Sequence, residues 1–99
     1  MMTPDSPADL VLWVAPQSPA SVRARRNLEA VLEDYDRRQI RLVVRDVASD
    51  AALAESDHVV FTPTLVVRIG NAVARVVGDL VDAAAITNVL TMGGLEKKQ

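Results

Sequence analysis

A continuous apolar run followed at once by a helix start is the feature that most restricts the fold of this chain. Residues 10–15 read Leu-Val-Leu-Trp-Val-Ala, the pattern of a central strand buried on both faces of a sheet. Pro16 ends the run, and Ser18-Pro19 offers a capping hydroxyl and a proline at the first helical position. The sequence therefore predicts a buried strand that leads directly into a helix.

The segment after Pro19 has the apolar spacing of an amphipathic helix. Its stripe falls at i, i+4, i+7, i+8 and i+11, and its members are Ala24, Leu28, Val31, Leu32 and Tyr35. Arg37 and Arg38 follow at the point where a helix dipole favours cations. We therefore expect a long helix that ends near this arginine pair.

One more strand and helix pair, followed by a hairpin, can be identified downstream. Residues 40–47 predict a second strand, and Ser49 or Asp50 is expected to cap a short helix over residues 51–54. Residues 64–69 and 72–77 predict a hairpin, because the glycine of the intervening Gly70-Asn71 suits the first loop position of a type II′ turn.

A last helix is predicted after the hairpin. Asp82 is its expected cap, and Ile86, Val89 and Leu90 are expected to face inward until Gly93-Gly94 ends it. The element order is then βαβαββα, a mixed four-stranded sheet flanked by helices, which is the order of the thioredoxin fold. We expect residues 10–92 to form one domain, between a flexible arm over residues 1–9 and a polar tail over residues 93–99.

The composition excludes several function classes. The chain has no cysteine, which removes thiol chemistry and cysteine-based metal sites, and residues 15–18, where related enzymes carry a reactive cysteine, read Ala-Pro-Gln-Ser. A net charge of -2 gives no field to gather nucleic acid or anionic lipid. Neither a signal peptide nor an apolar stretch of roughly 20 residues is present, so we expect a soluble, cytoplasmic protein with no membrane or nucleic-acid partner.

Candidate site residues are few. Pro63 stands before the third strand, where we expect a cis proline that presents a binding edge rather than a trans proline that opens the strand. His58 is the only histidine and is interpreted as a surface residue. Asp46, Asp50 and Asp57 lack a ligand repeat, so no metal and no other cofactor is predicted.

Several segments in order resemble the KaiB family of clock proteins, and together they cover roughly residues 10–80. They are Ser21-Val22-Arg23-Ala24, Asp46-Val47, Leu53-Ala54-Glu55 with Asp57, Thr62-Pro63-Thr64-Leu65 and Gly78-Asp79-Leu80. The sensor domain of the clock histidine kinase SasA is the second most similar family, but there the domain precedes a kinase.

The resemblance implies a function that the spacing of residues alone does not indicate. Members of the family are non-enzymatic, bind the ring-shaped ATPase KaiC and capture KaiA. The resemblance implies that Arg23 and Arg75 are basic contact residues, and that His58, which stands where a lysine is common, is a third partner-binding residue. A charge run such as Arg23, Arg25 and Arg26 is otherwise usually a solvated face. The alternatives are an adaptor of a KaiC-like ATPase outside a complete clock, or a redox-dead thioredoxin-like or glutaredoxin-like binding domain.

The resemblance also implies fold switching, since family members exchange a ground-state fold, often tetrameric, with a thioredoxin-like monomer that binds KaiC. This sequence departs from the family pattern at Val67 and Ala74, where basic residues are frequent, and at Val89 and Thr91, where glycine and aspartate are usual. Valine costs less than glycine inside a helix and can bury its side chain. We therefore expect mainly the thioredoxin-like monomer rather than the tetrameric ground-state fold.

Overall fold

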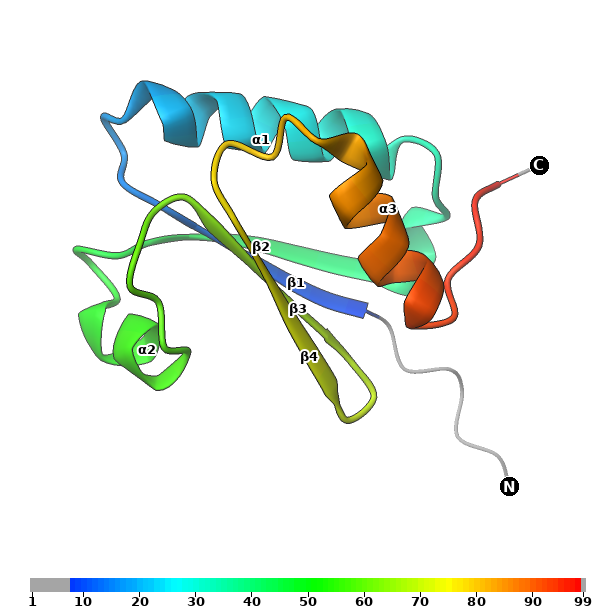
Figure 1. The fold of residues 1–99 in the computed structure, drawn as a ribbon. Helices are drawn as coiled ribbons and strands as arrows, with labels where there is room; N and C mark the ends of the chain where they lie inside the picture. The colour runs from blue at the N-terminus through cyan, green and yellow to red at the C-terminus, as the bar shows by residue number, and fades with distance from the viewer. Residues whose placement is uncertain (1–7, 99) are drawn as a thin grey trace.

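A computed structural model describes residues 8–98 and confirms the predicted thioredoxin-like order of elements. The elements are β1 (Ala8–Val14), α1 (Pro19–Leu32), the 3-10 turn η1 (Arg37–Gln39), β2 (Ile40–Asp46), α2 (Ala51–Ser56), β3 (Thr64–Ile69), β4 (Ala72–Val77) and α3 (Ala83–Met92). Figure 1 shows them as one sheet with helices on both faces.

The strands form a four-stranded mixed sheet in the order β2-β1-β3-β4. β1 runs parallel to β2 and antiparallel to β3, and β3 pairs with β4 as an antiparallel hairpin. The hairpin closes over Gly70-Asn71, and Gly70 has a φ of 61°, the left-handed conformation that a glycine adopts without strain. β2 and β4 are therefore the two edges of the sheet.

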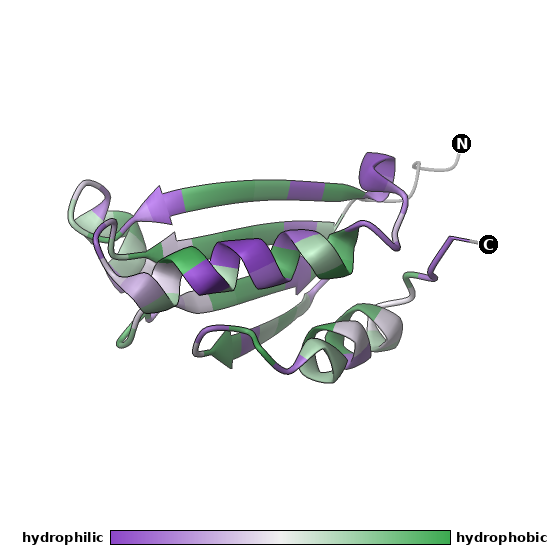
Figure 2. Cartoon of the chain, turned by 90° about the horizontal axis from the view of Figure 1, so that it is seen from above, coloured by the Kyte–Doolittle hydropathy of each residue, from purple (hydrophilic) through white to green (hydrophobic). Residues whose placement is uncertain are grey.

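The two faces of the sheet are covered unequally. α1 and α3 lie along one face (Figure 1) and enclose the larger core. Its fully buried side chains include Leu10, Leu12, Leu28, Leu32, Leu65, Ile86 and Leu90. The short α2 covers only one end of the other face, where Ala54 packs with Trp13 and Val66. Seen from above in Figure 2, the strands are mostly hydrophobic and α1 carries hydrophilic stretches.

The predicted helix caps at Ser18 and Asp82 are confirmed. The Ser18 side chain accepts a hydrogen bond from the backbone amide of Ser21, and Asp82 accepts one from the amide of Ala84, so each satisfies a free amide in the first turn. Asp50 occupies the cap position of α2 but makes no capping hydrogen bond. Its carboxylate lies 3.5 Å from the Arg45 guanidinium instead.

The first helix is shorter than its apolar spacing predicts. α1 ends at Leu32 and contains no basic residue in its last turn, so the expected placement of Arg37 and Arg38 at its end is wrong. Tyr35 leaves the helix and forms a β-bridge with Lys97. The Asp36 side chain then accepts a hydrogen bond from the amide of Arg38 and starts η1, which explains why the two arginines belong to a separate turn.

The ends of the chain add contacts beyond the predicted domain. Residues 1–7 of the expected arm lie outside the described residues, and Ala8 and Asp9 are already part of β1. In the segment expected to be a polar tail, Leu95 is buried against the larger core. The amide of Lys98 also donates a hydrogen bond to the carbonyl of Asp34, which ties the segment after α3 to the end of α1.

Candidate functional site

Asp57, the C-cap residue directly after α2, is the centre of a side-chain network on the face of the sheet that α2 partly covers. Its Oδ2 accepts a hydrogen bond of 3.1 Å from Nε1 of Trp13 on β1, and its Oδ1 accepts one of 2.7 Å from Arg68 on β3. Trp13 is fully buried, and only 16% of the Asp57 side chain is exposed. One carboxylate therefore joins α2 to two neighbouring strands.

The electrostatics of Asp57 favour its charged form. Burial raises the pKa of this carboxyl, but the hydrogen bonds from Arg68 and Trp13, together with the charges of Arg68 and Arg75, outweigh burial. The net result is a pKa below the ordinary aspartate value of 3.8. Asp57 is therefore an ionised structural anchor at neutral pH and not a proton donor.

The network brings together two of the predicted contact residues, His58 and Arg75. Nε and Nη2 of Arg75, on β4, donate to the backbone carbonyl of Asp57 at 3.1 and 3.0 Å. His58 follows directly and is exposed, with a φ of 58° that places it at the left-handed position after a helix end. Arg75 thus fixes the turn that presents His58.

Arg23 lies on α1, which covers the opposite face of the sheet. Its Nε donates to the Asp79 carboxylate at 3.2 Å, and Asn27 donates to the Asp79 carbonyl at 2.9 Å. Asp79 belongs to the loop that follows β4. Arg23 and Arg75 therefore do not share a face, but each contacts residues next to the same edge of the sheet.

Exposed apolar side chains occur in the loop before β3 and at the end of β4. Phe61 is 65% exposed and Val60 78% exposed in the loop before β3, and Val77 at the end of β4 is 60% exposed. Pro63, expected to be cis, follows a cis peptide bond from Thr62, and its carbonyl accepts a hydrogen bond from the Gly78 amide. Exposed apolar residues that form a contiguous patch mark protein-interaction surfaces, whereas single exposed apolar residues are normal.

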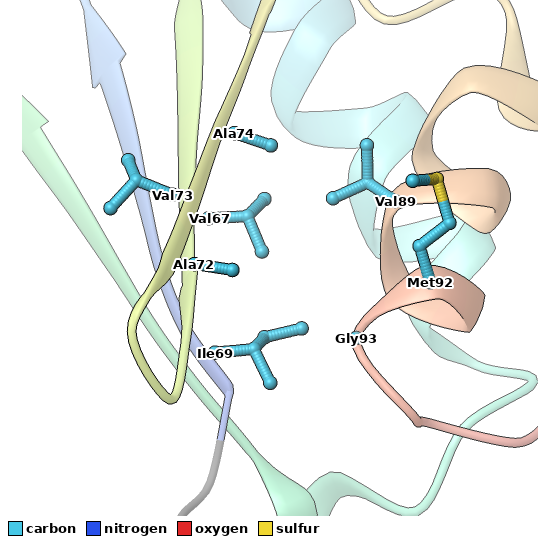
Figure 3. Close-up of a pocket in the computed structure, with 8 residues that line it drawn as sticks. All are labelled: Val67, Ile69, Ala72, Val73, Ala74, Val89, Met92 and Gly93. Atoms are coloured by element: carbon cyan, nitrogen blue, oxygen red, sulfur yellow. The ribbon is translucent and has the colours of Figure 1, made fainter.

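An apolar groove of about 220 Å³ lies between the β3–β4 hairpin and α3. Its lining includes three residues at which the sequence departs from the KaiB-family pattern, namely Val67, Ala74 and Val89. Figure 3 shows Val67, Ala74 and Val89 pointing toward one another across this groove, whereas Val73 points to the other side of the hairpin. Val89 is half-buried against the larger core, as expected for an inward position. Thr91 is exposed.

The arrangement offers no centre for metal or thiol chemistry within residues 8–98. No three His, Asp or Glu side chains gather there as metal ligands. Asp46 accepts a hydrogen bond from the Ala48 amide, and Asp50 pairs with Arg45, so each carboxylate has a local structural partner. No helix in the same range is long and apolar enough to cross a membrane.

Comparison with known proteins identifies the family. The KaiB domain family matches residues 11–92. The chain belongs to the KaiB family. Circadian clock oscillator protein KaiB of Prochlorococcus marinus (strain MIT 9313) is 40% identical over 81 residues, which cover 82% of this chain and 68% of that protein.

The KaiB protein of Synechococcus elongatus is likewise 40% identical over 81 residues, which cover 82% of this chain and 79% of that protein. Among solved structures, oxidised mitochondrial thioredoxin 3 from Saccharomyces cerevisiae aligns with a TM-score of 0.73 at 15% identity, over 88% of this chain and 79% of that one. The similarity to thioredoxin 3 shows only that the two proteins share a fold. A KaiB-family chain without cysteine has no thioredoxin-type redox activity.

Sequence reasoning missed the role of Asp57 in this KaiB-family chain. From spacing alone, Asp57 is one of three unconnected aspartates, whereas in the structure it contacts Trp13, Arg68 and Arg75. These partners are far apart along the chain, so no local spacing reveals them. The exposed loop residues could have been found, since Val59-Val60-Phe61 is an apolar run directly before the expected cis proline.

Proposed function

We propose that this chain is a non-enzymatic regulator of a circadian clock that binds a KaiC-type ATPase, with KaiA as a second partner. The observation that carries the proposal is the set of exposed arginine, histidine and apolar side chains on α1, on β4 and in the segment between α2 and β3 of a KaiB-family chain. Its members are Arg23, His58, Phe61, Arg75 and Val77. Such a surface suits protein binding, because apolar contacts supply affinity and charges select the partner.

The stretch where thioredoxin-like enzymes carry their nucleophile supports a binding role over catalysis. Ser18 is the hydroxyl of that stretch, and it is engaged in capping α1. No base contacts it: the hydrogen bond that it accepts comes from a backbone amide. Nucleophilic catalysis needs a general base within hydrogen-bond reach, so residues 15–18 have no activated nucleophile.

The experiment that tests the proposal is complex formation with the KaiC-type ATPase of the same organism. We expect a stable complex on size exclusion in the presence of ATP, and a weaker one from the double variant R23A/R75A. R26A is the matched control, because Arg26 is an exposed arginine on α1 outside the contacts described above. Absence of a complex with and without ATP would contradict the proposed function.

We further propose that the thioredoxin-like monomer is the main form of the free protein. Val89 supports this, because it packs against the larger core from α3. A glycine there would lose that packing and favour a less ordered backbone. Thr91, the other departure in the same helix, is exposed and adds no burial. The bias toward the monomer is therefore assigned mainly to Val89.

The substitution V89G is expected to shift the free protein toward the tetrameric fold. Lost helix propensity and lost burial together cost α3 about 1–2 kcal/mol, which matters when two folds differ by a few kcal/mol. N88G is the control, because Asn88 is an exposed neighbour on the same helix. Light scattering after size exclusion at micromolar concentration measures the effect. A tetrameric wild-type protein, or equal shifts in both variants, would refute the role of Val89.

A further inference from the structure

The outer edge of β4 has backbone groups that no strand of residues 8–98 pairs with. The hairpin register pairs Ile69 with Ala72 across its two-residue loop, and the Gly78 amide donates to the carbonyl of Pro63. Because hydrogen-bonded pairs alternate along an antiparallel ladder, residues 72, 74 and 76 bond to β3. The amides and carbonyls of Val73, Arg75 and Val77 therefore face outward.

The side chains of these three residues give the open edge a definite chemistry. Val73 is 48% exposed and Val77 is 60% exposed, and exposed Arg75 lies between them. All three stand on the sheet face that α2 leaves partly open, and Figure 3 shows Val73 pointing away from α3. The edge thus presents the alternating pattern apolar, cationic, apolar along one face.

Arg75, the charged residue on this edge, forms no ion pair with a carboxylate within the described chain, although its charge helps to lower the pKa of Asp57. The Arg75 guanidinium bonds only to a backbone carbonyl, that of Asp57. On the opposite edge, β2, the corresponding arginines are neutralised, since Arg41 pairs with Asp9 and Arg45 with Asp50. Of the two edges, β4 is therefore the one whose arginine has no ion-pair partner among the described residues and can pair with a carboxylate of another protein.

We propose that β4 is a strand-addition site for an extended segment of the ATPase partner that carries a carboxylate opposite Arg75. Directly opposed residues share a face of the sheet, so the segment has apolar side chains two residues before and two residues after the acidic one, opposite Val73 and Val77. Main-chain hydrogen bonds supply affinity, and the acidic residue sets the register. The inference rests on the proposed function, because it names the part of the partner that this site would bind.

Amide hydrogen exchange in the complex with the KaiC-type ATPase tests the inference on the wild-type chain. We expect exchange at the outward amides of Val73, Arg75 and Val77 to slow at least tenfold on binding. A complex that leaves these amides unprotected would overturn strand addition while leaving the proposed function intact. Absence of any complex would instead remove the proposed function and this inference with it.

A backbone variant provides the second test. V73P deletes an outward amide without touching the hydrogen bonds to β3, which an edge strand tolerates, and should weaken binding about fivefold or more. V73T is the matched control, because it keeps the amide and the branched shape, and should bind within about twofold of wild type. Fluorescence of the buried Trp13 reports whether V73P is folded. Equal affinities of folded V73P and V73T would contradict the site.

Discussion

Replacing Asp57 with alanine is expected to lower the free energy of unfolding by about 3 kcal/mol. The substitution leaves the indole N–H of Trp13 in a fully buried position without its acceptor, and it removes the carboxylate that holds Arg68 at 2.7 Å. A buried donor without a partner costs about 1–3 kcal/mol, and a lost charged hydrogen bond adds a comparable amount. Urea unfolding followed by Trp13 fluorescence measures the change.

The matched control for this substitution is D9A. Asp9 pairs with Arg41 on the same face of the sheet, but their side chains are 45% and 66% exposed, and exposed ion pairs contribute about 0–1 kcal/mol. We expect D9A to unfold close to wild type. Similar losses in D57A and D9A would mean that the Asp57 network does not stabilise the fold.

The same network gives a pH dependence with a definite sign. The pKa of Asp57 in the folded chain is below its ordinary value, so its contribution to stability is fully present above the unfolded-state pKa of about 3.9. It is lost as the pH falls through the folded-state pKa. The stability difference between wild type and D57N should therefore be constant near neutral pH and shrink below about pH 4.

The fold could be predicted because its signals are local. The uninterrupted run that became β1, the Ser18 and Asp82 caps and the Gly70 turn each act over a few residues. The end of α1 could not be predicted in the same way. Tyr35 continues the apolar spacing of the helix, yet its backbone pairs with Lys97 from the far end of the chain, and only tertiary structure supplies that partner.

The candidate site was less accessible to sequence reasoning. Arg23, His58 and Arg75 came from resemblance to a family and not from spacing. The structure adds that Arg75 holds the backbone of Asp57 beside His58, and that Arg23 reaches Asp79 from the other face. Both contacts join residues that are far apart in the sequence. An outward-facing edge is likewise a property of the strand order, which four strand-like segments alone do not determine.

Reversing the charge at Arg75 is expected to have the largest effect on partner binding. R75E would place a carboxylate where the guanidinium now donates two hydrogen bonds to the carbonyl of Asp57. It would also repel an acidic partner residue, and like charges across an interface cost several kcal/mol. We expect at least a tenfold loss of affinity for the KaiC-type ATPase, measured by titration calorimetry at fixed salt.

Two further variants separate charge from structure in this prediction. R26E makes the same charge change on exposed α1 and should bind nearly as wild type, which would exclude a general effect of net charge. R75K keeps the charge but loses the planar guanidinium group, which offers two donors in a fixed geometry. Its affinity should therefore lie between those of wild type and R75E. Because Arg75 is exposed, R75E should stay folded by Trp13 fluorescence. A folded R75E that binds as tightly as R26E would show that the β4 edge is not the contact surface.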